Sequence, residues 1–417
     1  MIDDIGPQKT RTATSPGGAA APAETAAAAN AAAALPAGVP PIQTATIDYE
    51  TWLGRHVDII AADLQHKHRL MGGGAFAFLR ATFYRWMQFW PELCPDLDRA
   101  PCVLAVGDIH IENFGTWRDI EGRLVWGVND FDEACDLPYT LDLVRLAASA
   151  LLAQREGAIG SSAEDVCGMI LGGYRRGLET DGRPFVLEEK RGWLRTLAIN
   201  ELRDPVRFWD KLNGLPDKPL AVPHKVRRAL RRNMPDDGLR ITVRHRVAGV
   251  GSLGRPRFVA LARWHGAHVA REAKAVAPSA AVWAAGTRGD RMKDDIRYND
   301  ILDLAVRCPD PILRLKDDWV IRRLAPDCSK IDIGALPKKR EERKLLRAMG
   351  WEIANIHLGS RRAMKQVRRD LDERPAAWLT EAAHRMADAV QADWKVWRGE
   401  AGAQPPPEPE NTGRVTK

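Results

Sequence analysis

The sequence predicts an α+β protein, with a helical body that carries two acidic loops and a small β-rich segment that carries a cluster of glycines. Three observations support this. Amphipathic stretches of helical period dominate both ends of the chain. Two short apolar runs, residues 102–106 and 123–129, each end at an aspartate, as buried strands leading into polar loops would. Over residues 239–276 the helical period gives way to alternation interrupted by glycines, which indicates antiparallel strands.

The composition is that of an ordinary soluble protein. The 417 residues allow two domains or one two-lobed domain, and 45% are hydrophobic and 28% charged. The net charge of +7 comes mostly from arginine clusters at residues 225–233, 338–347 and 360–369. These are solvated helix faces or a surface that attracts anions.

The cysteine spacing and the hydropathy pattern indicate in which cellular compartment the protein is expected. Six cysteines are scattered without a CxxC pair, which favours reduced thiols. The first ten residues are polar and acidic, unlike a secretory signal, and no apolar run reaches membrane-spanning length. We therefore expect a cytoplasmic protein without a membrane partner.

The N-terminal half is expected to be a disordered tail followed by helices. Residues 1–45 are rich in Ala, Pro, Thr and Gly and lack the large apolar side chains that would offset their ordering entropy. From residue 46 to 235 we expect a helical region that holds both acidic loops, including a helix over 141–156 directly after the second loop.

The C-terminal half is expected to be β-rich at first and then helical. Within residues 236–330 we expect three antiparallel strands over 239–276 and a further strand over 318–325. Residues 331–399 are amphipathic and are expected to complete the helical region, and residues 400–417 form a second disordered tail.

The acidic loops read GDIHIEN (107–113) and NDFDEA (129–134). Carboxylates at the ends of buried strands are costly unless they bind a metal, a partner or a substrate. Phosphoryl transfer needs one carboxylate near the acceptor hydroxyl, and an Asn and a second Asp to hold magnesium. Asp108, Asn113 and Asp130 supply that set in that order, five and then 17 residues apart.

These motifs, followed by LDLVRLAAS (141–149), resemble the catalytic and metal-binding loops of the protein-kinase-like superfamily, in its aminoglycoside and choline kinase branch. Together with GVGSLG (249–254) they resemble more closely the bacterial domain-of-unknown-function family 2252, over most of residues 50–360. The resemblance implies a two-lobed kinase-like fold that uses ATP and Mg²⁺. It implies Asp108 as catalytic base, His110 orienting the loop or the acceptor, Asn113 and Asp130 as magnesium ligands with Asp132 beside them, and Asp142 as a structural brace.

The glycines Gly249, Gly251 and Gly254, with Ser252 between them, form a G-x-G-x-x-G pattern. The pattern alone also occurs in dinucleotide-binding folds and in plain turns. Here a second strand follows, not the helix that a dinucleotide-binding fold requires. Strand–glycine loop–strand is the arrangement that covers phosphates in kinases.

A kinase of this type also needs a lysine on the next strand. Lys274 lies 20 residues after Gly254 and has the right reach, whereas the family's lysine before an EA pair corresponds to Arg271. The two point to opposite faces of a strand, so only one can pair with phosphates. We favour Lys274. The usual glutamate partner is absent or replaced by an aspartate such as Asp295 or Asp300, since no Glu occurs between Glu272 and Glu341.

The order of the motifs predicts a circularly permuted chain, because the glycine loop follows the catalytic loop by about 140 residues instead of preceding it. In that arrangement Gly251 and Asp130 must lie on the same side of the molecule. The helix over residues 344–360 would correspond to the one that normally leads into the catalytic loop.

The sequence gives weaker indications of the residues that would contact the acceptor substrate. The stretch 67–83 also resembles the family, and Phe76, Phe78 and Arg80 line the acceptor side unless Gly72–Gly74 is a plain turn between helices. The acidic residues Glu112, Glu133 and Asp136 weakly favour a cationic acceptor, although solvated positions explain them equally well.

The expected function is that of an ATP- and magnesium-dependent phosphotransferase acting on a hydroxyl of a small molecule, with nucleotide and acceptor as its partners. The alternatives on the same fold are a nucleotide-binding pseudokinase and a nucleotidyl (AMP) transferase. A metal-dependent phosphoesterase is disfavoured because no GNH block exists. A nucleic-acid partner is disfavoured because no aromatic–basic strand signature occurs.

Overall fold

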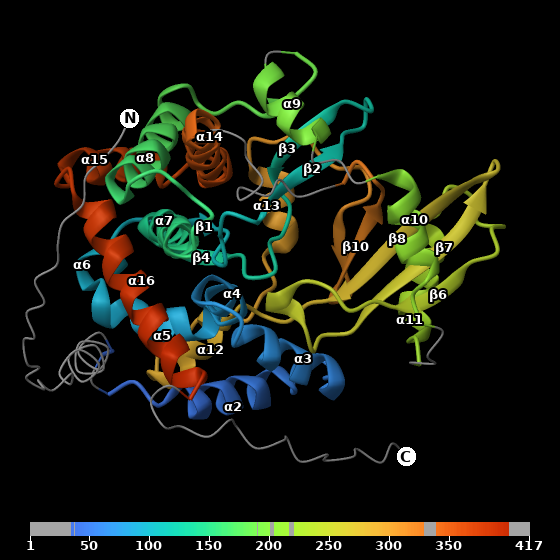
Figure 1. The fold of residues 1–417 in the computed structure, drawn as a ribbon, viewed down its shortest axis with the longest axis horizontal. Coiled ribbons are helices and arrows are strands. Elements are labelled where there is room, and N and C mark those ends of the chain that lie inside the picture. The colour runs from blue at the N-terminus through green and yellow to red at the C-terminus, as the bar shows by residue number, and fades with distance from the viewer. Residues whose placement is uncertain are drawn as a thin grey trace, which may run out of the picture.

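The computed structural model describes residues 35–36, 38–189, 191–200, 204–216, 221–328 and 339–399. Of the tails predicted over 1–45 and 400–417, residues 1–34, residue 37 and residues 400–417 lie outside these ranges. The described chain is a mixed α+β protein, as the sequence predicts. A five-stranded antiparallel sheet lies at one side and most of the helices at the other (Figure 1).

The first helices are α2 (Ile42–Leu53), α3 (Ala61–Met71), α4 (Ala75–Ala81), α5 (Phe83–Leu93) and α6 (Pro95–Asp98). The helix α2 begins four residues before the boundary expected at residue 46, because Ile42 and Ala45 are apolar and bury against the core. The helix α5 has a strong aromatic face, and its Trp86, Phe89 and Trp90 are almost fully buried.

Four short strands hold the acidic loops. The predicted strands are β1 (Cys102–Ala105) and β3 (Leu124–Val128); the sequence missed β2 (Phe114–Arg118) and β4 (Cys135–Pro138), which are too short and too mixed in polarity to show a period of two. The strand β1 pairs with β4 and β2 pairs with β3, both antiparallel. Each acidic loop therefore crosses from one small sheet to the other, and the two pairings hold the loops side by side.

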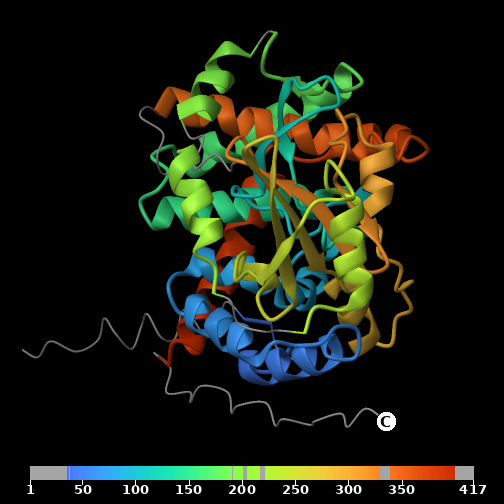
Figure 2. The ribbon, with the colours of Figure 1, turned by 90° about the vertical axis from the view of Figure 1, so that its right-hand side faces the viewer.

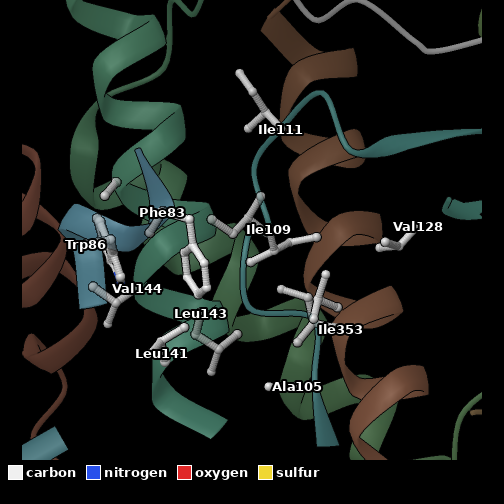
Figure 3. Close-up of a cluster of buried hydrophobic side chains, with 14 of the residues drawn as sticks. Phe83, Trp86, Ala105, Ile109, Ile111, Val128, Leu141, Leu143, Val144 and Ile353 are labelled. Carbon is white, nitrogen blue, oxygen red and sulfur yellow. The ribbon is translucent and has the colours of Figure 1, made fainter. Parts of the chain in front are cut away.

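The helix α7 (Tyr139–Arg155) runs through the centre of the core, and every residue from Tyr139 to Ala153 is buried. Its Leu141, Leu143 and Val144 pack among side chains from α5, β1, the first acidic loop and α14, as Figure 3 shows. The elements that follow are α8 (Ala163–Glu179), β5 (Phe185–Val186), α9 (Gly192–Asn200), α10 (Pro205–Asn213) and α11 (His224–Arg232).

The larger sheet has the order β6-β7-β8-β10-β9. Its strands are β6 (Thr242–His245), β7 (Arg257–Trp264), β8 (Ala267–Ala275), β9 (Arg314–Lys316) and β10 (Trp319–Leu324), which include the three strands predicted over 239–276 and the one predicted over 318–325. The helix α11 packs on one face through Val226 and Leu230. The helix α10 packs on the other through Phe208 and Leu212 (Figure 2).

The remaining elements are a glycine-containing 3-10 turn η1 (Val250–Ser252), α12 (Ala280–Thr287), α13 (Tyr298–Leu304), α14 (Lys339–His357), α15 (Met364–Glu373) and α16 (Trp378–Trp397). The helices α14 and α16 return to pack on α8 and α7. Where α8 crosses α14, Gly173 faces the Arg347 carbonyl and Gly350 faces the Ile170 carbonyl so closely that neither leaves room for a Cβ. Across the part of the chain that the structure describes, no helix is long and apolar enough to span a membrane.

Candidate functional site

A pocket forms where the two acidic loops meet the glycine turn and the end of α4. Its empty space, open mouth included, is about 520 Å³. It is lined by Arg80, Val106, Asp108, His110, Asn113, Asp130, Asp132, Glu133, Gly249, Val250, Gly251, Ser252 and Arg255. Residues predicted from motifs widely separated in the sequence thus lie in one pocket, and Gly251 and Asp130 are on the same side of the molecule.

The first acidic loop is braced by three polar side chains of α7. Asp142 accepts hydrogen bonds from the backbone N–H of Val106 (2.8 Å) and Gly107 (2.9 Å), and it also contacts His357 Nε2 at 3.0 Å. Ser149 Oγ accepts from the backbone N–H of Ile111 (3.1 Å). Together with Arg145 they stand at i, i+3 and i+7, one face of a helix. Asp142 therefore holds the backbone at the start of the first acidic loop.

Asp108 is held from two sides. Arg145 donates from Nε to Asp108 Oδ1 at 3.0 Å and from Nη2 to the same oxygen. The glycine turn covers the carboxylate, because a Cβ on Gly251 would lie 3.5 Å from Asp108 Oδ2 and 2.8 Å from the Arg80 carbonyl. Burial raises the pKa of Asp108, and Arg145 opposes that shift. A carboxylate with a raised pKa is a better proton acceptor than an exposed one.

The second loop is tied to the larger sheet by Lys274. Its Nζ lies 3.0 Å from Asp130 Oδ1 and 2.7 Å from Asp132 Oδ1. Burial alone would raise the pKa of Asp130, but Lys274 and Arg322 outweigh it and hold that pKa below its ordinary value. Burial and the neighbouring Asp130 carboxylate raise the pKa of Asp132 to about 6. Asp130 is therefore the more strongly ionised member of the pair.

The acidic partner of Lys274 differs from the candidates that the sequence suggested. Asp300 pairs with Arg297 and Asp295 is exposed, so neither contacts the lysine. The two carboxylates of the second loop take that place, because Lys274 extends from β8 to contact both of them. Arg271, the alternative cation, lies on the opposite face of β8 and donates to the Asn233 carbonyl at 2.6 Å.

The oxygen donors in the pocket fit a hard cation such as Mg²⁺. Asn113 Nδ2 donates to the Asp108 carbonyl at 2.7 Å, which leaves its Oδ1 as the free ligand atom beside Asp130 and Asp132. No group of three or more His, Cys, Asp or Glu side chains arranged for a metal occurs within the described residues. A magnesium site here would therefore depend on the mixed amide and carboxylate set.

Other predicted residues lie at the edge of the pocket or away from it. His110 is buried, and its Nδ1 accepts from the backbone N–H of Glu112 at 3.2 Å. Its ring lies edge-to-face with Phe76, with 6.2 Å between the ring centroids. Arg80 pairs with Glu112 at 2.8 Å and reaches the pocket. The structure does not bring Phe78 to it, since this side chain is fully buried in the core near Trp397. Gly254, with a φ of +93°, packs on Leu64 outside the pocket lining.

The acidic residue Glu133 is not solvated, contrary to one of the two interpretations that the sequence allowed. It is buried, accepts from the backbone N–H of Ala280 at 2.7 Å, and pairs with Arg255 at 3.2 Å. Burial raises its pKa, which Arg255 opposes. Glu112 and Asp136 are more exposed, and they pair with Arg80 and Arg297.

Sequence reasoning missed the arginines of the site. Arg145 could have been found as a cation within the apolar run of α7, and Arg255 as the residue directly after the last glycine. A third group surrounds Glu272 on β8. Glu272 is fully buried and pairs with Arg257 at 2.9 Å, with Arg322 at 2.6 Å and with Arg246. Nothing in the sequence brings those four positions together.

The comparisons with known proteins agree with the resemblance to one family. No curated protein and no solved structure matched the chain. A family model described as an uncharacterised protein conserved in bacteria, DUF2252, matches residues 60–201 and 222–400. These ranges contain both acidic loops, the glycine turn and Lys274. The chain belongs to the DUF2252 family of bacterial proteins.

Proposed function

We propose that this protein is an ATP- and magnesium-dependent phosphotransferase of kinase-like, circularly permuted fold that acts on a hydroxyl of a small molecule. One observation carries the proposal. Asp108, Asn113 and Asp130 line one pocket with the glycine turn, and Lys274 of the sheet pairs with Asp130 at its edge. Phosphoryl transfer requires this combination of an acceptor-side carboxylate, oxygen ligands for the metal, backbone over the phosphates and a cation beside them.

Each residue has a distinct task in this proposal. Asp108 orients the acceptor hydroxyl and takes its proton. Asn113 and Asp130 would hold Mg²⁺, which neutralises phosphate charge when bound. The turn at Gly249–Ser252 covers the phosphates, and Lys274 moves from the carboxylate pair to the phosphates when the donor binds. The rate gain would come from positioning and charge neutralisation.

The permuted arrangement is supported by the end of α14. His357 contacts Asp142, and Ser360 Oγ accepts from the backbone N–H of Leu104, so this helix ends beside the strand that leads into the first acidic loop. The end of α14 therefore lies next to the start of the first acidic loop, although α14 follows that loop in the sequence. A circular permutation requires such proximity between segments that the chain does not join directly.

One observation favours a second function, nucleotide binding without transfer. Lys274 already pairs with both carboxylates of the second loop. The next helix along the chain, α12, carries no Asp or Glu that could take Lys274 as an ion-pair partner instead. A lysine kept on Asp130 and Asp132 would leave a nucleotide-binding pseudokinase.

Thermal stability with ATP and Mg²⁺ tests the site first. Ligand at about 100 times its dissociation constant stabilises the native state by roughly 2.7 kcal/mol. We expect a rise in Tm that requires Mg²⁺ and vanishes in Asp130→Asn. The matched control is Asp136→Asn, whose side chain is 60% exposed outside the pocket and should keep the rise. No rise with any nucleotide would remove the proposal.

Product analysis then separates the reactions. Wild type incubated with ATP and a panel of hydroxyl acceptors should release ADP, and Asp108→Asn should bind ATP but release ADP about 10²–10⁴ times more slowly. Release of pyrophosphate with AMP attached to the acceptor would replace phosphotransfer by nucleotidyl transfer. Binding without any product would establish the pseudokinase.

A further inference from the structure

The Glu272 cluster carries more positive charge than its own carboxylate balances. Three guanidinium groups, of Arg246, Arg257 and Arg322, surround one fully buried carboxylate. Lys274 and the two carboxylates that it contacts, of Asp130 and Asp132, adjoin this cluster, so four cations face three carboxylates and one positive charge remains. Arg257 is itself buried, with 5% of its side chain exposed, whereas 15% of Arg246 and 25% of Arg322 face solvent. Uncompensated cations near a protein interior are costly unless an anion joins them.

The cluster lies between the glycine turn and the second acidic loop. Arg257 Nη2 donates to Ser252 Oγ at 2.6 Å, which ties the cluster to the turn. Lys274 is two residues from Glu272 on the same face of β8, and it reaches Asp130. Arg322 also interacts electrostatically with Asp130. An anion seated on the excess cations would therefore lie next to the oxygen donors of the pocket.

The same face of the sheet offers no apolar slot for a nucleobase in the described residues. Beyond Glu272, the side chains of Val259, Leu261 and Leu324 are covered by Phe208 and Leu212 of α10. The pocket lining itself is almost entirely polar, with Val106 and Val250 as its aliphatic members. Base recognition normally relies on apolar and aromatic contact, and α10 occupies the surface that would provide it.

We propose that the protein grips its phosphoryl donor by the phosphate chain, with Arg246 and Arg322 as direct phosphate ligands, and discriminates little between nucleobases. This inference rests on the proposed function for the identity of the donor. It names a donor class: nucleoside triphosphates of any base, with linear inorganic polyphosphate able to occupy the same site.

The experiment measures thermal stability and competition with four probes: Mg-ATP, Mg-GTP, sodium tripolyphosphate and adenosine. We expect the dissociation constants of ATP and GTP to agree within about threefold, tripolyphosphate to compete with both, and adenosine to have no effect. Arg246→Gln and Arg322→Gln should each weaken tripolyphosphate and ATP about tenfold or more, the size of one lost charged hydrogen bond. The control Arg263→Gln removes an exposed arginine at the far end of β7 and should change neither.

The opposite results would overturn the inference. They are stabilisation by adenosine comparable to that by ATP, a preference for one base of tenfold or more, or glutamine variants that bind tripolyphosphate like wild type. Arg246→Lys and Arg322→Lys keep the positive charge and should retain most of the affinity for tripolyphosphate. They therefore distinguish a loss of charge from a loss of folded structure in the glutamine variants. The two proposals fail separately: arginine-dependent binding of tripolyphosphate without any effect of Mg²⁺ or Asp130→Asn contradicts only phosphotransfer, and base-selective Mg-ATP binding that requires Asp130 contradicts only this inference.

Discussion

Two buried glutamates, one in the larger sheet and one in the helical region, have opposite protonation behaviour. Burial alone would raise the pKa of Glu272, but Arg257, Arg322 and Arg246 outweigh it and hold that pKa well below its ordinary value. Burial raises the pKa of Glu352 to about 7, and the opposing effect of Arg307 is smaller. Both side chains are at most 2% exposed. Burial therefore does not decide the charge; the number of cations in contact does.

The difference describes the two regions more generally. In the sheet, cations exceed the carboxylate that gathers them. In the helical region the polar groups under the first acidic loop bond mainly to its backbone, as with Asp142, which accepts from two backbone amides. The sheet thus has an excess of positive charge around Glu272, whereas the helical region holds the first acidic loop by hydrogen bonds to its backbone.

The largest expected effect comes from removing the carboxylate at the centre of the sheet. Glu272→Gln leaves three guanidinium groups without their anion, and we expect a loss of about 3–5 kcal/mol in the free energy of unfolding at pH 7. Urea unfolding measures it. The control Glu179→Gln, at a side chain 60% exposed, should change stability by less than about 0.5 kcal/mol. If the two variants changed the free energy of unfolding equally, the ion pairs of Glu272 would contribute nothing to stability.

A pH series on Glu352→Gln tests the other glutamate. The folded-state pKa is about 7 against an ordinary value of 4.5, so between these pH values the folded protein binds more protons than the unfolded chain. The contribution of Glu352 is fully present below about pH 4.5 and is lost as the pH rises to about 7. At 1.36 kcal/mol per unit, the stability of wild type relative to the variant should fall by roughly 3 kcal/mol across that window.

The sheet glutamate should behave in the opposite way. Because the pKa of Glu272 is lowered, its contribution is present above its ordinary value of 4.5 and is lost as the pH falls below it. Parallel pH dependence of Glu272→Gln and Glu352→Gln in urea unfolding would contradict the comparison of the two regions.

The packing of the helical region is tested at its closest helix crossing. Gly173→Ala places a Cβ against the backbone carbonyl of Arg347, and we expect a loss of about 1–3 kcal/mol by overpacking. The adjacent Gly172 has open space around it, so Gly172→Ala should stabilise the helix by about 0.5–1 kcal/mol. Calorimetric Tm values of the two variants should therefore move in opposite directions, and movement in the same direction would contradict the close crossing.

The smallest effect is expected at the brace of the first acidic loop. Ser149→Ala removes the acceptor of the Ile111 N–H, which costs about 1 kcal/mol if that amide stays buried. Amide hydrogen exchange at Ile111 should accelerate while exchange in the larger sheet stays unchanged. An unchanged rate at Ile111 would mean that the rest of the loop holds it without Ser149.

Much of the architecture could be predicted because it depends on local pattern. The core helix after the second acidic loop, expected over 141–156, is α7 at Tyr139–Arg155, and β1 and β3 coincide with the apolar runs. The short strands β2 and β4 could not be predicted, since what specifies them is pairing with β3 and β1, not their own four or five residues. The start of α2 was placed four residues late because an Ala- and Pro-rich composition masked Ile42.

The candidate site divides in the same way. Asp108, Asn113, Asp130 and the glycines carry their chemistry in short motifs, so the sequence by itself determined which side chains gather and that they follow buried strands. Only the tertiary structure decided what each one contacts: Arg145 on Asp108, two aspartates on Lys274, and three arginines on Glu272. The physical reason is that charge pairing acts through space over a few ångströms, between residues that the chain separates by up to 144 positions.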